Sequence, residues 1–219
     1  MPAQFPVRQM DAAHAWFLTE AGRAVLASEE DAVARALADR PGQPWLWCGP
    51  VPRETPAQGR GLYLTAGGDG RWHGKVRCDL PLPLPTESFG AVVLQHVARR
   101  QGPFGPELLR EAARLLVTGG RLWLFVLNPL APYRWRWQGS GISAFEPLGW
   151  RRRLREAGLE PDPVSQGLGP SWAVRASPLV QQGPGLRAAF VLRAEKRSMP
   201  LTPVRPRAAL PLAQGVPAA

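Results

Sequence analysis

The chain has 219 residues, 45% of them hydrophobic, which is typical of one domain with a sizeable core. The formal net charge is +10, but nearly all the basic residues are arginine in a chain rich in alanine, glycine and proline, so composition explains the charge as readily as a nucleic-acid surface does. No apolar run approaches the roughly 18 residues of a membrane span, and the first residues lack an apolar signal core. We therefore expect a soluble, cytoplasmic protein. Cys48 and Cys78 lack the spacing of a zinc site, so no metal or disulfide is predicted.

The first third of the chain predicts one helix and two strands. A helix is expected over Thr19–Asp39, because Thr19 suits the N-cap and apolar residues recur at helical spacing. The short apolar runs Trp45–Cys48 and Gly61–Thr65 predict buried strands. Residues 66–74 contain four glycines and no apolar periodicity, so we expect a loop there.

The middle of the chain predicts a strand–helix–strand unit. Phe89–Val97 is an uninterrupted apolar run, typical of a strand buried on both faces. Pro106–Val117 has proline at its start and leucines on one face, which indicates a helix that ends at Gly119-Gly120. Arg121–Leu127 is a second buried strand. This order implies parallel strands joined by a right-handed crossover.

Weaker signals flank this unit. Val76–Cys78 can form a strand, and Asp79–Pro85 cannot be helical because three prolines interrupt it. Phe145–Ala157 predicts a further helix, and Ala188–Ala194 predicts the last strand. The tail is rich in proline and arginine. We therefore expect a helical extension over 1–43, one α/β domain over 44–197 and a disordered tail over 198–219.

Two segments carry a family resemblance. Asp79–Val97 (DLPLPLPTESFGAVVLQHV) and Leu108–Leu122 (LLREAARLLVTGGRL) resemble the type 11 methyltransferase family, over roughly a quarter of the chain. Within it, the chain is similar to a bacterial group with Asn-Pro-Leu after the fifth strand, here residues 128–130. The resemblance implies a Rossmann-like class I methyltransferase fold, which has a mostly parallel central sheet with helices on both faces.

The resemblance also implies a site for S-adenosylmethionine. Asp79 matches the acidic residue that accepts a hydrogen bond from the adenine amino group, and Leu80 would line the adenine face. Gln95 and His96 match the residues beside the methyl donor, and Gly49 matches the remaining glycine of the first-strand loop. These segments meet beyond the carboxyl ends of the strands, where ligands bind in open α/β sheets.

The chain departs from the family pattern in the loop after the first strand. Cys48-Gly49-Pro50-Val51-Pro52 retains one glycine, and Pro50 and Pro52 have no amide donor. No acidic residue ends the second strand to hold the ribose hydroxyls, and Asp69 in the following glycine-rich segment is the nearest candidate. Gly49 and Asp79 can equally serve as turn residues.

His96 is a candidate general base, because a neutral imidazole can accept a proton from a methyl acceptor near pH 7. The alternative is a histidine that only satisfies a hydrogen bond at the end of a buried strand. The sequence shows no second group in a defined relation to it.

Aromatic and basic residues alternate in Tyr133–Trp137, and one tryptophan precedes three arginines in Trp150–Arg153. Such a pattern is typical of single-stranded nucleic-acid surfaces, or of a lid with half-buried tryptophans. In Tyr133–Trp137 the alternation indicates an extended segment that would expose both sets of side chains.

The sequence supports two alternative functions. The first is an S-adenosylmethionine-dependent methyltransferase that acts on an unknown small-molecule or macromolecular acceptor, with nucleic acid not favoured. The alternative is a catalytically inactive methyltransferase-like protein that binds nucleic acid or an acidic protein through the aromatic-basic surface.

Overall fold

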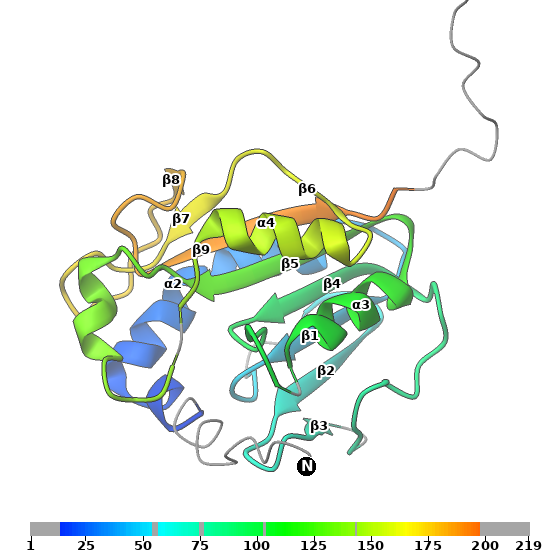
Figure 1. Cartoon of the computed structure of the whole chain (residues 1–219), viewed down its shortest axis with the longest axis horizontal. Coiled ribbons are helices and arrows are strands. Elements are labelled where there is room, and N and C mark those ends of the chain that lie inside the picture. Colours follow the sequence, from blue (N-terminus) through cyan, green and yellow to red (C-terminus); the bar gives the residue numbers. More distant parts are fainter. Residues whose placement is uncertain (1–13, 54–56, 75–76, 103, 143, 198–219) are drawn as a thin grey trace, which may run out of the picture.

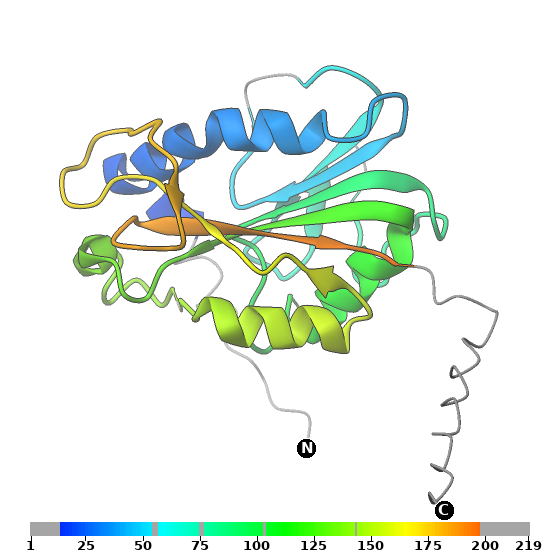
Figure 2. The same ribbon diagram turned by 90° about the horizontal axis from the view of Figure 1, so that it is seen from above.

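The computed structural model describes residues 14–53, 57–74, 77–102, 104–142 and 144–197. Within these residues one mixed sheet forms the centre of the molecule (Figure 1). Figure 2 shows helix α2 on one face of the sheet and helices α3 and α4 on the other. The helices are α2 (Glu20–Leu37), α3 (Pro106–Leu115), α4 (Pro147–Glu156) and the 3-10 helix η1 (Pro132–Arg136). The strands are β1 (Trp45–Gly49), β2 (Gly61–Ala66), β3 (Trp72–Gly74), β4 (Phe89–Gln95), β5 (Leu116–Leu127), β6 (Glu160–Pro161), β7 (Gln166–Leu168), β8 (Gln181–Gln182) and β9 (Ala189–Glu195).

The strands follow the order β3-β2-β1-β4-β5-β9-β7-β8, and β6 pairs with β9 beside this path. The inner pairs β2–β1, β1–β4 and β4–β5 are parallel. β3 at one edge and β9 beside β5 run antiparallel to their neighbours. The carboxyl ends of β1, β2 and β4 therefore lie together at one edge of the sheet, where a ligand site is expected.

The predicted strand–helix–strand unit is confirmed, with β4 and β5 parallel and α3 between them along the chain. α3 begins at Pro106 and buries its leucines in the core beneath the sheet. The prediction that the helix runs to Val117 and ends at Gly119-Gly120 was wrong. β5 begins at Leu116, and a register shift between Phe89 and Ala91 takes up the extra residues, as a β-bulge does.

The leading helix is also confirmed. The Thr19 side chain accepts a hydrogen bond from the backbone N–H of Gly22 at 3.2 Å, as its N-cap role requires. The apolar face of α2, which includes Val33 and Ala36, packs on the β1–β4–β5 face together with Trp45 and Trp47.

The segment after β2 differs from the expected loop. Residues 72–74 form β3, which pairs with the end of β2. The predicted strand Val76–Cys78 lies partly outside the described residues, and Cys78 makes an isolated antiparallel bridge with Trp72. The sequence did not predict β3, because a three-residue edge strand is too short to show apolar periodicity.

The connection between β1 and β2 is unusual for neighbouring parallel strands. Such strands need a crossover, which is ordinarily a helix that covers one face of the sheet. Residues 50–60 make this crossover, and their described part contains no helix. α2 packs against β1 on this face, and no described helix covers β2 beside this connection.

Candidate functional site

The carboxyl ends of β1 and β4 are linked to α2 by a buried polar network. The Nε1–H of Trp47 donates to Oε1 of Gln95 at 3.1 Å, and the amide of Gln95 donates to Glu29 at 2.7 Å. Nε2 of His96 lies 2.9 and 3.0 Å from the two Glu29 oxygens. Glu29 and His96 have side-chain exposures of 0% and 2%. Buried polar groups must be paired in this way to be tolerated.

His96 has two features that a purely structural histidine does not need. Its backbone lies in the left-handed region with φ +55°, which is uncommon for a residue with a side chain. Its Nδ1 is buried and has no hydrogen-bond partner among the described residues. Because a carboxylate only accepts, Nε2 of His96 donates to Glu29, and the neutral tautomer that fits this bond keeps a lone pair on Nδ1. Glu29 is thus the second group that the sequence did not reveal.

The crevice beyond these strand ends is filled by the N-terminal turn before α2. The Phe17 ring stacks on His96 with centroids 4.9 Å apart, and Nδ1 of His14 donates to the carbonyl of Pro50 at 2.7 Å. Two small cavities remain against His96, with volumes of about 20 and 10 Å³. Small-molecule sites commonly enclose about 300–1,000 Å³. The side chains present in this conformation therefore do not fit S-adenosylmethionine at the ends of β1 and β4.

Gly49 ends β1 and is required there by packing. A Cβ built on Gly49 would lie 2.0 Å from the Trp47 indole, so the ring occupies the space of a side chain. This contact accounts for the glycine without a ligand.

Asp79 and Leu80 lie away from the network. The Asp79 carboxylate is 60% exposed and pairs with Arg71 at 3.2 Å. Leu80 is partly buried and packs against the core beneath the sheet. The structure thus brings Gln95, His96 and Gly49 to one region and leaves Asp79 at the surface. The cofactor contacts of all five residues stay predictions.

Asp69, the nearest acid to the end of β2, belongs to the turn between β2 and β3. It pairs with His73 at 3.0 Å and with Arg77. The hydrogen bond from His73, and then that from Arg77, hold the pKa of Asp69 below its ordinary value. Its charge is therefore already compensated within the turn.

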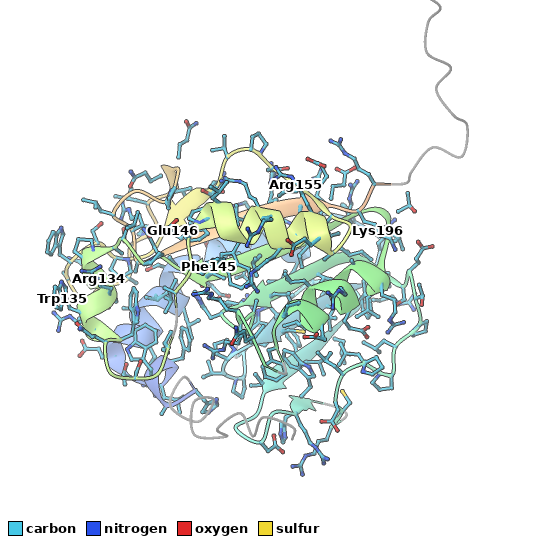
Figure 3. All side chains as sticks on the ribbon, viewed as in Figure 1. Arg134, Trp135, Phe145, Glu146, Arg155 and Lys196 are labelled. Atoms are coloured by element: carbon cyan, nitrogen blue, oxygen red, sulfur yellow. The ribbon has the colours of Figure 1, made fainter. Side chains whose placement is uncertain are left out.

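The aromatic-basic segment does not form the expected extended surface. Residues 132–136 form η1, and the helical turn buries Tyr133 and Trp137 in the core while Trp135 stays 65% exposed. Figure 3 shows Arg134 and Trp135 at the edge of the molecule. Trp150 is also buried. The aromatic residues are mainly core, so the lid-like alternative describes them better.

Other site types are not found among the described residues. No group of histidine, cysteine or acidic side chains could hold a metal ion there. None of the described helices is long and apolar enough to cross a membrane. Cys48 is buried and Cys78 is half-buried.

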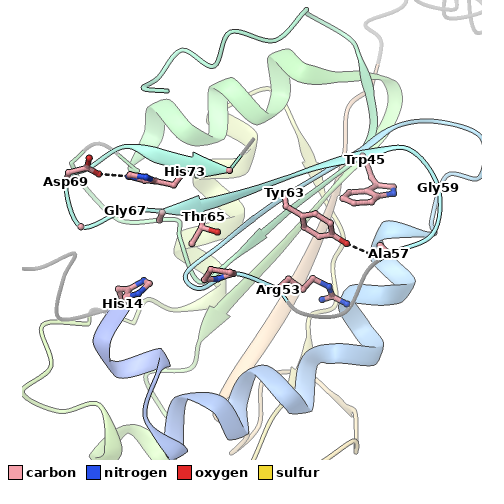
Figure 4. Close-up of a pocket in the computed structure, with 15 residues that line it drawn as sticks. His14, Trp45, Arg53, Ala57, Gly59, Tyr63, Thr65, Gly67, Asp69 and His73 are labelled. Atoms are coloured by element: carbon pink, nitrogen blue, oxygen red, sulfur yellow. Dashed lines mark hydrogen bonds and ion pairs between the residues drawn. The ribbon is translucent and has the colours of Figure 1, made fainter. Parts of the chain in front are cut away.

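A large cavity lies beside the helix-free connection between β1 and β2 (Figure 4). Its volume is about 1010 Å³. One wall is the face of β1 and β2 that carries Trp45, Tyr63 and Thr65, and another is the connection with Pro52 and Ala57. The cavity takes the place in which a crossover helix ordinarily covers parallel strands.

The sequence did not predict which side chains close the crevice. It also did not predict the cavity beside β1 and β2. The apolar periodicity of α2 predicts the helix without any role for Glu29. Phe17 and His14 precede that helix. A glutamate at a buried helical position was the only available signal for the network. The signal for the cavity was the short, proline-rich connection after β1.

No protein-family model matches the chain, and no curated protein matches it. The prediction of the type 11 family therefore has no support from a family model. Solved structures do match. An S-adenosylmethionine-dependent methyltransferase from Thermotoga maritima is 20% identical, with a TM-score of 0.57 over 87% of this chain and 98% of that one. Geranyl diphosphate C-methyltransferase from Streptomyces coelicolor is 18% identical, with a TM-score of 0.51 over 90% and 99%.

Identities this low establish the fold and not the activity. The mixed α/β sheet with the core order β3-β2-β1-β4-β5 agrees with this fold. The chain has the Rossmann-like fold of class I methyltransferases.

Proposed function

We propose that this chain is a binding protein built on the methyltransferase fold, and that it does not transfer methyl groups. One observation carries the proposal: the described side chains occupy the crevice at the ends of β1 and β4 and leave two cavities of about 10 and 20 Å³ against His96. The groups that fill it are held by specific contacts, since Phe17 stacks on His96 and His14 bonds to Pro50. Opening the crevice would have to break these contacts together.

The loop after β1 supports the same proposal. In the family pattern, backbone N–H groups of a glycine-rich turn hold the methionine part of the cofactor. Here Pro50 supplies no N–H, and its carbonyl accepts the bond from His14. No helix begins in the described part of the connection, so those residues bring no helix N-terminus to the crevice.

A second candidate is methyl transfer from S-adenosylmethionine to an unknown acceptor. The Glu29–His96 pair favours it, because a carboxylate that holds Nε2–H leaves Nδ1 able to take a proton. In this account His96 would act on the acceptor, and the N-terminal turn would have to move to admit both molecules.

Calorimetric titration separates the two candidates. The binding proposal predicts no saturable heat with S-adenosylmethionine or S-adenosylhomocysteine at millimolar concentration. Saturable binding of either one would overturn it. The variants Asp79→Asn and Glu107→Gln remove carboxylates of similar exposure, 60% and 63%. If binding occurs, a larger loss for Asp79→Asn would identify Asp79 as the adenine contact.

A further inference from the structure

The cavity on the β1–β2 face has an aromatic wall, to which Trp45 and Tyr63 contribute. The indole of Trp45 covers Gly61 on the neighbouring strand, where an added Cβ would lie 2.0 Å from the ring. The Tyr63 ring contacts those of Trp45 and Trp47, with centroids 4.8 and 5.7 Å apart. The rings meet edge to face, with interplanar angles of 61° and 69°, and the half-buried Tyr63 ring leaves a surface on which another planar aromatic ring can pack.

Hydrogen bonds hold the cavity in shape. The Tyr63 hydroxyl accepts from the backbone N–H of Ala57 at 2.7 Å, and Nε1–H of Trp45 donates to the carbonyl of Gln58 at 2.9 Å. Both bonds tie the connection to the strands. The volume of about 1010 Å³ is therefore largely pre-formed, as small-molecule sites usually are.

The charged side chains of the lining are already paired. Arg53 forms an ion pair with Glu30, and Asp69 forms one with Arg77. A charged ligand would have to enter a partly apolar space whose charges are compensated, which is unfavourable. The chemistry of the lining therefore favours an uncharged ligand.

Hydrogen-bond acceptors gather at one end of the cavity. Figure 4 shows Thr65, His14 and His73 at this end and Tyr63 with Trp45 toward the other. His14 donates from Nδ1 to Pro50, and His73 contacts Asp69 through Nε2. In the neutral rings, the opposite nitrogens keep their lone pairs. The Thr65 hydroxyl lines the same cavity and can also accept a hydrogen bond.

We infer that this cavity binds an uncharged, planar aromatic molecule that carries a hydrogen-bond donor at one end. The aromatic body lies along Tyr63 and Trp45, and the donor faces Thr65, His14 and His73. The inference rests on the proposed binding function, and it names the class of ligand and its site.

The test uses β-naphthol, which is planar and has a hydroxyl donor, and naphthalene, which lacks one. Binding to the full chain is measured by calorimetry and by saturation-transfer NMR. We expect saturable, sub-millimolar binding of β-naphthol and weaker binding of naphthalene. Thr65→Val should raise the Kd for β-naphthol about fivefold, because one neutral hydrogen bond is lost. The control Thr118→Val alters an exposed threonine of β5 and should leave the Kd unchanged.

Thr65→Trp should block the end of the cavity that holds the acceptors and abolish binding of β-naphthol, with circular dichroism to confirm folding. If this variant does not fold, the Kd values of Thr65→Val and the comparison of β-naphthol with naphthalene still test the inference. Equal Kd values for Thr65→Val, Thr118→Val and the unmodified chain would overturn the inference, as would an absence of saturable binding. Dimerisation that Thr65→Trp abolishes would make the cavity an interface between copies, which also overturns it. S-adenosylmethionine binding that Thr65→Val leaves unchanged would overturn the proposed function alone, because it would concern the crevice at His96 and not this cavity.

Discussion

Among single residues, Glu29 makes the most consequential buried contacts. Its carboxylate accepts from Gln95 and from His96 and is fully buried. A buried donor that loses its acceptor retains the full cost of its desolvation. The network therefore fixes α2 against the ends of β1 and β4, whatever chemistry His96 performs.

Replacing Glu29→Ala should lower the free energy of unfolding by about 3 kcal/mol, because two buried donors lose their acceptor. Urea denaturation measures the change. Glu107→Ala on α3, which is 63% exposed, is the matched control and should stay within about 0.5 kcal/mol of the unmodified protein. Similar losses in both variants would show that the network does not stabilise the fold.

The two thiols should differ in reactivity. Burial raises the pKa of Cys48 far above its ordinary value, and burial also raises the pKa of Cys78 to a lesser extent. A raised pKa means that little thiolate is present at neutral pH. We expect a disulfide reagent to label Cys78 slowly and Cys48 only as the protein unfolds. Rapid labelling of the folded Cys78→Ser variant would contradict this expectation.

At the level of elements, the end of β1 is shaped by packing. Gly49→Ala would bring a methyl group against the Trp47 indole and should cost about 2 kcal/mol of stability. In a Trp47→Leu background the same change should cost less, because the ring is gone. Thermal unfolding of the four proteins measures this coupling. Equal costs in both backgrounds would remove the packing explanation for Gly49.

The start of α2 offers a second test at this level. Thr19→Ala removes the side-chain acceptor for the Gly22 N–H and should cost about 1 kcal/mol. Thr118→Ala, on an exposed part of β5, should cost less than half as much by the same measurement. A cost for Thr19→Ala no larger than that of the control would mean that α2 does not depend on its cap.

For the whole molecule, the sequence predicted the elements whose patterns are local. The buried strand Phe89–Val97 and the amphipathic helix that follows it carry their own periodicity, so the parallel unit β4–α3–β5 was predictable. β3 and the early start of β5 were not, because pairing with neighbouring strands decides them.

The candidate site was only partly predictable for the same reason. Gln95 and His96 could be placed at the end of a strand, and strand ends are where this fold binds ligands. Glu29 is 67 residues from His96 in the chain, so their contact depends on how α2 packs. Closure of the crevice by Phe17 and His14, and the cavity beside the β1–β2 connection, likewise depend on tertiary packing.

The central claim is that the crevice at the ends of β1 and β4 is closed. A crystal structure grown with millimolar S-adenosylhomocysteine tests it most directly. We predict that Phe17 stacks on His96, that His14 contacts Pro50 and that no nucleoside lies beyond these strands. Density for the nucleoside in this crevice, with Asp79 against its adenine, would contradict the claim.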